Sequence, residues 1–249
     1  MAFLLFLVFF LSNIMRGAAF RIVCLHGSGG NGPSFEARLQ PLIEQLEVGG
    51  RRCEWVFPTA PFQLNENEPG FAWWRMAPYE RSFNATELIG APQSLAMVED
   101  LYPFDCIIGH SQGAMLGAVV VARGLSGETQ VLPSRGIFSG AAIPAPFRPL
   151  LQSLSLRYTP AQEEIPGISA SASVPVPESA SVSASGVKAA LPPPAFQSIH
   201  CIGAIDSIAP IELAALLAEY LQGEVHMHSG GHTVPLDDQS LAKMVALLC

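Results

Sequence analysis

Short apolar runs alternate with segments of helical periodicity along most of the chain. Apolar runs bounded by Gly, Pro or polar residues are typical of buried strands, whereas apolar residues three and four apart indicate helices that pack on a sheet. The predicted strands are residues 21–25, 54–57, 104–108, 135–140, 198–203 and 224–228. The predicted helices are residues 34–48, 91–101, 114–122, 210–221 and 235–248. The alternation predicts an α/β fold with about six mostly parallel strands, doubly wound with helices on both faces.

The first nineteen residues do not fit this alternation. Residues 2–11 are uniformly apolar, too short to span a bilayer but as long as the apolar region of a secretory signal, and no basic residue precedes them. Three alternatives remain for residues 1–19: a signal peptide, an uncleaved membrane anchor, or an apolar extension packed on the domain. We favour the first two.

Residues 159–194 also differ from the rest of the chain. They are rich in Ala, Ser and Pro and contain no aromatic residue, so they cannot bury enough apolar surface to offset the entropy of ordering. We predict a disordered insertion within one domain of residues 20–249, because the strand at 198–203 is needed to complete the sheet.

Composition narrows the classes of function. The chain has 249 residues, 49% of them hydrophobic, which suits one domain with a sizeable core. Its net charge is −8 and it has no basic cluster, which indicates that nucleic acid is not a partner. Five cysteines lie far apart and three fall in predicted strands, which favours reduced core residues over a disulfide framework or a metal site.

A Gly-x-Ser-x-Gly sequence, residues 109–113, lies between a predicted strand and a predicted helix. The bare pattern also occurs by chance in turns. A strand, a tight turn with serine at its tip and a helix together are the context of a nucleophile elbow, in which Ser111 attacks a carbonyl. The backbone N–H of Gln112, at the start of that helix, can donate to a developing oxyanion.

A serine nucleophile needs a base and an orienting acid, and in α/β-hydrolases the chain order is Ser, Asp or Glu, then His. Asp206 is the single aspartate between Ser111 and His232, and it follows a predicted strand. His226 and His228 alternate along a strand and are better explained as structural. His232 follows two glycines in a loop, so we predict that it is the base.

A glycine-rich loop follows the first predicted strand. It lacks the Lys-Ser/Thr of a phosphate-binding loop and its glycines do not have dinucleotide-binding spacing. The sequence His-Gly before an elbow fits an oxyanion loop better, with the Ser28 N–H as the second donor beside Gln112. We expect His26 to fix this loop by hydrogen bonding.

Residues 63–86 form a long stretch without clear periodicity but with many large apolar residues, among them Phe71, Trp73, Trp74 and Met76. Long loops in compact domains are usually functional or disordered, and the aromatic content argues against disorder. Two interpretations are about equal: an apolar wall that binds substrate over the active site, or a loop that packs its own aromatics.

Five short motifs resemble the FSH family of serine hydrolases, a branch of the α/β-hydrolases. They are Leu-His-Gly at residues 25–27, Ala-Trp-Trp at 72–74, Gly-His-Ser-Gln-Gly-Ala at 109–114, Gly-Ala-Ile-Asp-Ser-Ile-Ala-Pro at 203–210 and Gly-Gly-His-Thr-Val-Pro at 230–235. The resemblance covers the chain from Phe20 onward apart from residues 159–194. It implies a hydrolase of carboxylic esters or thioesters that uses no cofactor. The family includes esterases for medium and long alkyl esters and thioesterases that release polyketide chains.

The family is mostly cytosolic, so the apolar leader leaves the location open between the cytoplasm and secretory-pathway targeting or a membrane anchor. We expect a serine hydrolase that cleaves carboxylic acyl esters of small-molecule size through Ser111, His232 and Asp206, with no metal and no cofactor, and with membrane contact only through the leader. An acyl thioesterase for carrier-protein or coenzyme A thioesters is the alternative. A non-catalytic ligand-binding protein on the same scaffold is disfavoured by the complete set of three residues.

Overall fold

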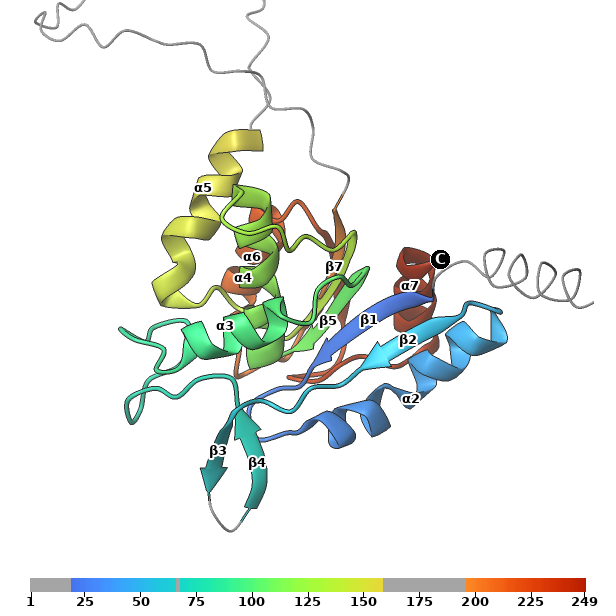
Figure 1. Ribbon diagram of the computed structural model, residues 1–249, viewed down its shortest axis with the longest axis horizontal. Helices are drawn as coiled ribbons and strands as arrows, with labels where there is room; N and C mark the ends of the chain where they lie inside the picture. The colour runs from blue at the N-terminus through green and yellow to red at the C-terminus, as the bar shows by residue number, and fades with distance from the viewer. Residues whose placement is uncertain (1–18, 66–67, 159–195) are drawn as a thin grey trace, which may run out of the picture.

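A six-stranded parallel sheet runs through the centre of the computed structural model, which describes residues 19–65, 68–158 and 196–249 (Figure 1). Its strands lie in the order β2-β1-β5-β6-β7-β8, and every neighbouring pair is parallel. The strands are β1 (Phe20–Leu25), β2 (Cys53–Val56), β5 (Cys106–His110), β6 (Arg135–Ser139), β7 (Gln197–Gly203) and β8 (Glu224–His228). Parallel strands place their carboxyl ends at one edge, so the loops after β1, β5, β6, β7 and β8 meet there.

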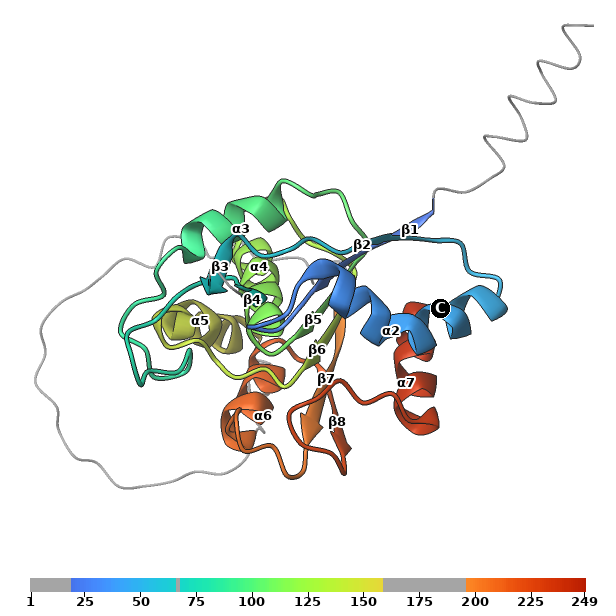
Figure 2. The ribbon, with the colours of Figure 1, turned by 90° about the horizontal axis from the view of Figure 1, so that it is seen from below.

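Helices cover both faces of the sheet (Figure 2). One face carries α3 (Ala91–Glu99), α4 (Gln112–Ser126), α5 (Arg148–Tyr158) and α6 (Ile211–Tyr220), and the other carries α2 (Gly32–Val48) and α7 (Asp238–Leu248). Each layer has its own core of buried aliphatic side chains, and the middle strand β5 is buried along nearly its whole length. The doubly wound α/β prediction is confirmed, with six parallel strands.

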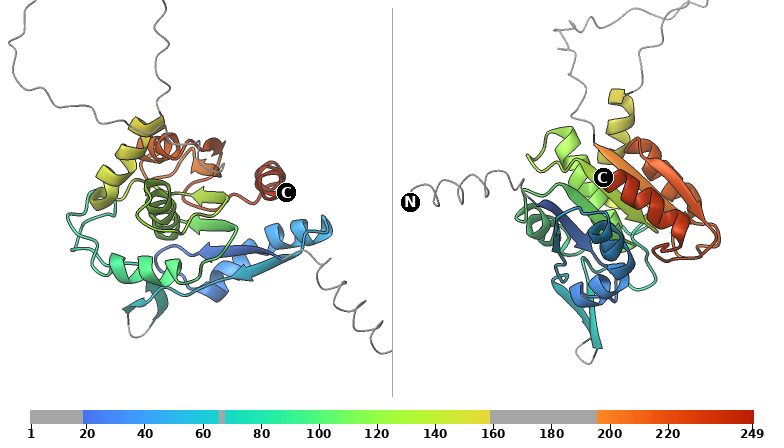
Figure 3. Two further views of the ribbon diagram at one scale, coloured as in Figure 1. Left: turned by 45° about the horizontal axis from the view of Figure 1, so that its top comes forward. Right: turned by 90° about the vertical axis from the view of Figure 1, so that its right-hand side faces the viewer.

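Most predicted elements are present with ends shifted by a few residues, and three differences have a clear physical cause or were not predicted at all. The final helix begins at Asp238, because the Asp237 side chain accepts the Ser240 N–H at 3.1 Å and caps it. Helix α5, with the one-turn helix η1 (Ala145–Phe147) before it, lies in a segment for which we predicted no helix. The stretch without clear periodicity contains an antiparallel hairpin, β3 (Phe62–Asn65) and β4 (Glu68–Ala72), which projects beside the main sheet (Figure 3). Its strands are too short for alternation to be visible in the sequence.

Two predicted segments fall almost entirely outside the described residues. The apolar leader, residues 1–19, and the Ala/Ser/Pro-rich insertion, residues 159–194, therefore stay predictions. Within the three described ranges, no helix is long and apolar enough to cross a membrane.

Strand β7 carries a buried histidine on the face that packs under α6. His200 is 2% exposed, its ring lies 5.1 Å from that of Phe138, and its Nε2 lies 3.3 Å from the Ser198 Oγ. Burial lowers the pKa of His200 to about 3, so the ring is neutral in the folded protein at ordinary pH.

We expect His200 to make stability fall with acidification. Its pKa is about 3 in the folded protein and about 6.5 in an unfolded chain. Between these values the unfolded state binds more protons, so the free energy of unfolding decreases as pH falls. From pH 7 to pH 5 the loss due to this group is about 2 kcal/mol. Urea titrations at pH 7 and pH 5 measure the change. The free energy of unfolding of His200→Gln should fall by about 2 kcal/mol less than that of the wild type. An equal drop in both proteins would contradict the assignment.

Candidate active site

Ser111 lies at the tip of a sharp turn between β5 and α4. Its backbone has φ 52° and ψ −121°, in a region that non-glycine residues rarely adopt. The Ser111 N–H donates to the Ser139 carbonyl at 2.8 Å, which holds this conformation against the neighbouring strand. The strained turn projects the serine side chain beyond the carboxyl edge of the sheet.

The two glycines of the motif are required by close backbone packing. A Cβ on Gly109 would lie 2.4 Å from the Ala114 Cα, and a Cβ on Gly113 would lie 2.3 Å from the Leu25 carbonyl oxygen. Both distances are far below contact distance, so the strand, the turn and the helix can approach only with glycine at these positions.

His232 connects Ser111 to Asp206. The His232 Nε2 lies 2.8 Å from the Ser111 Oγ, and its Nδ1 lies 2.8 Å from the Asp206 Oδ2. The Asp206 side chain is 2% exposed and that of His232 is 16% exposed, so the pair is largely screened from solvent. The residues come from the loops after β5, β7 and β8, which the parallel sheet brings to one edge.

The hydrogen bonds around Asp206 favour its charged form. Its Oδ1 accepts the backbone N–H groups of Ile208 at 2.8 Å and Ala209 at 3.0 Å, while its Oδ2 faces His232. Burial acts to raise the pKa of Asp206, but the Ala209, His232 and Ile208 donors outweigh it and the pKa is lowered. The carboxylate is therefore ionised and accepts the His232 Nδ1–H.

Two residues at the end of β6 contact the loop that carries His232. The Ser139 Oγ donates to the Thr233 carbonyl at 3.0 Å. Gly140 has φ 60°, and a Cβ there would lie 2.9 Å from the His232 Cε1. The sequence analysis did not single out Ser139 or Gly140, although their position at the carboxyl end of a parallel strand places them at the same sheet edge as Ser111.

A second histidine packs against the first. The His110 ring lies 5.1 Å from the His232 ring, tilted by 45°. Burial, then the neighbouring His232 and Arg38, lower the pKa of His110 to about 3. His110 is therefore neutral and adds no positive charge beside His232.

Two backbone N–H groups lie beside the serine. Gln112 is the first residue of α4, where a helix has no internal acceptor for the N–H. A Cβ on Gly27 would lie 3.1 Å from the Ser111 Cβ, so the loop after β1 runs directly past Ser111. Within the described residues, the N–H groups of Ser28 and Gln112 donate no hydrogen bond.

A cavity of about 300 Å³ opens at this edge of the sheet. Its lining combines Ser111, His232, Gln112 and Ser28 with an apolar wall and one exposed arginine. The wall residues are Met76, Phe83, Met115, Ile208 and Ala209, together with Ser82 and Arg81. Met76, Arg81, Ser82 and Phe83 come from residues 63–86, the stretch for which the sequence suggested a wall over the active site. The sequence did not single out Met115, Ile208 and Ala209, although the last two follow closely after Asp206.

Of the four predicted substrate-binding residues, only Met76 lines the cavity. Met76 lines the cavity, whereas Phe71, Trp73 and Trp74 are not among the lining residues. Trp73 is 0% and Trp74 1% exposed, so their rings lie inside the protein. Each indole N–H donates within the protein, from Trp73 to the His26 carbonyl at 2.8 Å and from Trp74 to the Ser82 Oγ at 3.0 Å.

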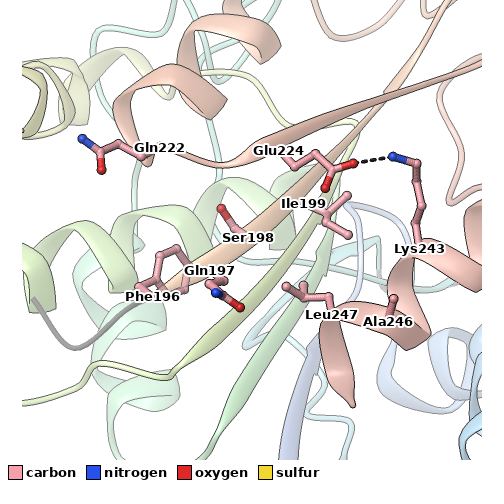
Figure 4. Close-up of a pocket in the computed structure, with 9 residues that line it drawn as sticks. All are labelled: Phe196, Gln197, Ser198, Ile199, Gln222, Glu224, Lys243, Ala246 and Leu247. Carbon is pink, nitrogen blue, oxygen red and sulfur yellow. Dashed lines mark hydrogen bonds and ion pairs between the residues drawn. The ribbon is translucent and has the colours of Figure 1, made fainter.

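A second cavity lies at the opposite edge of the sheet (Figure 4). It has a volume of about 470 Å³ and is bounded by the first residues of β7, the turn before β8 and the end of α7. An ion pair between Glu224 and Lys243 crosses it. It is larger than the cavity at Ser111, but it lies at the amino ends of the strands, away from the Asp206–His232–Ser111 chain.

The described part of the chain contains neither a metal site nor a disulfide bond. No group of three or more His, Cys, Asp or Glu side chains there is placed to hold a metal ion. All five cysteines are free, and those in β1, β5 and β7 are buried as core residues.

Two relatives are similar in sequence to this chain over most of its length. The chain is 29% identical over 248 residues to "Esterase OVCA2" of Danio rerio, which covers 89% of this chain and 92% of that protein. It is 26% identical over 235 residues to "Esterase CG5412" of Drosophila melanogaster, over 88% of this chain and 70% of that protein.

Solved structures show the same fold. Esterase PE8 superposes with a TM-score of 0.61 at 20% identity, covering 93% of both chains. SOBER1 of Arabidopsis thaliana superposes with a TM-score of 0.58 at 17% identity, covering 93% of this chain and 98% of that one. The family model described as "Serine hydrolase (FSH1)" matches residues 15–244. Because this match spans nearly the whole chain, the protein belongs to the FSH1 family of serine hydrolases.

Proposed function

We propose that the protein hydrolyses carboxylic acyl esters, with Ser111 as nucleophile, His232 as general base and acid, and Asp206 as the orienting carboxylate. The observation that carries the proposal is the continuous hydrogen-bonded chain from Asp206 through His232 to Ser111, with 2.8 Å at each step, beside a cavity. This is the arrangement that activates a serine for acyl transfer.

The reaction proceeds in two halves. His232 removes the Ser111 proton as the Oγ attacks the ester carbonyl, and it then gives that proton to the leaving alkoxide, which departs as the alcohol. Water next attacks the acyl-enzyme in the same way, His232 returns the proton to Ser111, and the carboxylic acid is released. Asp206 stays ionised throughout and stabilises the imidazolium that forms in each half. None of these steps requires a metal or a cofactor.

The backbone N–H groups of Ser28 and Gln112 are the proposed oxyanion donors. Neither N–H group has an acceptor among the described residues, and both residues line the cavity with Ser111. Donors of this kind stabilise the tetrahedral oxyanion more than the flat carbonyl, and each contributes about 3 kcal/mol to lowering the barrier.

The lining and size of the cavity favour a substrate with an uncharged acyl group. Its wall is mainly apolar side chains, and its volume of about 300 Å³ is at the lower end for ligand sites. The relatives named esterases support an oxygen ester as the scissile group.

We expect kcat/KM to rise with acyl length until the cavity is full. Each methylene group that enters the apolar wall gains up to ~0.8 kcal/mol, about a fourfold increase. Rates with p-nitrophenyl esters from acetyl to decanoyl measure this profile, and acyl thioesters of the same chains test the alternative of a thioesterase. A profile highest at acetyl would contradict an acyl role for this cavity.

Ile208 and Ile205 offer a matched pair for the same experiment. Both side chains are partly exposed, at 45% and 73%, but only Ile208 lines the cavity. Ile208→Ala should flatten the rise with chain length by removing part of the wall, while Ile205→Ala should keep the wild-type profile. Equal profiles for the two variants would remove Ile208 from the acyl site.

A further inference from the structure

Four consecutive residues, Phe71–Trp74, cross between the loop after β1 and the start of α4. This segment, here called the strap, begins in β4 and continues toward the buried interior below the cavity. Its two tryptophans are fully buried and make hydrogen bonds of similar length through their indole N–H groups. None of the four strap residues takes part in the proposed catalytic steps.

The strap is bonded to the loop that carries the Ser28 donor. The Gly29 N–H donates to the Phe71 carbonyl and the Phe71 N–H donates to the Gly30 carbonyl, both at 2.9 Å. The Trp73 Nε1–H donates to the His26 carbonyl at 2.8 Å. These three bonds flank Ser28 on both sides, so the strap sets where the Ser28 N–H lies.

The same strap is bonded to the elbow that carries the other donor. The Gln112 Oε1 accepts the Trp73 N–H at 2.7 Å, and the Gln112 Nε2 donates to the Trp74 carbonyl at 3.0 Å. Gln112 is 3% exposed, so these bonds do not compete with water. The amide thus pairs with the strap backbone as a neighbouring strand would.

Three further hydrogen bonds fix the parts that the strap connects. The Ser94 Oγ donates to the Trp73 carbonyl. The His26 Nε2 accepts the Ala60 N–H at 3.0 Å, which leaves its Nδ1–H to donate to the Gly27 carbonyl at 2.7 Å. Burial lowers the pKa of His26, consistent with a neutral ring in this role.

Trp73 is the residue that both networks share. Its backbone N–H is bonded to Gln112 and its indole N–H to the oxyanion loop, whereas the Trp74 indole is bonded to Ser82 in the cavity wall. We propose that Trp73 is a positioning residue that sets the separation of the two oxyanion donors, Ser28 and Gln112. The proposal rests on the proposed function. Oxyanion donors act at 2.7–3.1 Å from the oxygen, so a shift of about 0.5 Å in one of them weakens stabilisation of the transition state.

The adjacent tryptophans allow a matched test. Trp73→Phe and Trp74→Phe each remove one indole N–H and one ring from the same buried segment. The readouts are kcat and KM for p-nitrophenyl acetate and inhibition by a short alkyl trifluoromethyl ketone. Ser111 adds to that ketone to form a tetrahedral oxyanion, while the corresponding unfluorinated ketone reports binding without addition.

For Trp73→Phe we expect kcat to fall about tenfold and KM to change less than twofold. The inhibition constant of the trifluoromethyl ketone should rise by the same factor by which kcat/KM falls. Binding of the unfluorinated ketone should stay the same. Trp74→Phe should keep the inhibition constant of the trifluoromethyl ketone within about threefold of wild type. A loss specific to the tetrahedral adduct distinguishes positioning of the donors from a general loss of packing.

Equal losses in the two variants, or a fall in kcat with no change in trifluoromethyl ketone affinity, would overturn the role of Trp73. If Trp73→Phe fails to fold, replacing Trp73 with β-(3-benzothienyl)alanine keeps the bicyclic ring and removes only the N–H, with the same expected result. Wild-type protein that neither hydrolyses the acetate ester nor reacts with a fluorophosphonate would instead defeat the proposed function itself.

Discussion

Ser111→Ala should abolish covalent labelling by a fluorophosphonate and lower kcat for acyl esters by about 10⁶. The expectation follows from the geometry, because the Ser111 Oγ is the atom that lies 2.8 Å from the His232 Nε2. The fold should persist, since the backbone bond from the Ser111 N–H to the Ser139 carbonyl does not involve the hydroxyl. Gel-based labelling, ester turnover and circular dichroism measure the three quantities.

Ser229→Ala provides the control. Ser229 is exposed in the loop that carries His232, but it does not line the cavity with Ser111. This variant should label as the wild type does. Persistent labelling of the Ser111→Ala protein, or mass spectrometry that finds the probe on another serine, would show that the elbow serine is not the nucleophile.

Asp206→Asn should lower kcat by ~10⁴ while leaving Ser111 in place. The Asp206 Oδ1 accepts two backbone N–H groups, from Ile208 and Ala209, so an asparagine would keep its oxygen there and turn its NH₂ toward His232. An NH₂ group cannot accept the Nδ1–H, and His232 would adopt the tautomer with the proton on Nε2. That nitrogen could then no longer take the proton of Ser111. Steady-state kinetics at saturating ester measure the loss.

Glu212→Gln tests the assignment of the acid. Glu212 is an exposed residue in the first turn of α6, six positions after Asp206. Its change should affect kcat less than threefold. If Glu212→Gln costs as much as Asp206→Asn, or if Asp206→Asn costs little, then Asp206 is not the orienting acid.

The sequence predicted the elements around Ser111, Asp206 and His232 well because each motif has a local cause. Strand, glycine and helix patterns are visible within a few residues, and parallel strands place every following loop at one edge. Asp206 and His232 could therefore be proposed as neighbours of Ser111 from chain order and strand ends, although 121 positions separate His232 from Ser111.

The wall of the cavity could not be predicted in the same way. Phe71, Trp73, Trp74 and Met76 have similar composition and adjacent positions, yet Met76 alone lines the cavity. Which side of a loop faces a site depends on what packs behind it. Here the hairpin β3–β4 and the bonds to Gln112 turn the tryptophans inward, and no local pattern encodes those contacts.

By itself, the sequence determined the α/β architecture, the elbow at residues 109–113 and the membership suggested by five short motifs, because these depend on local periodicity and on close backbone contacts at Gly109 and Gly113 that only glycine permits. The tertiary structure alone decided the 2.8 Å hydrogen bonds through His232, the lining of the cavity and the strap that joins the loop after β1 to the start of α4. The physical reason is that burial and hydrogen bonding between distant segments decide which way a side chain faces, and those contacts exist only after the sheet and its helices have packed.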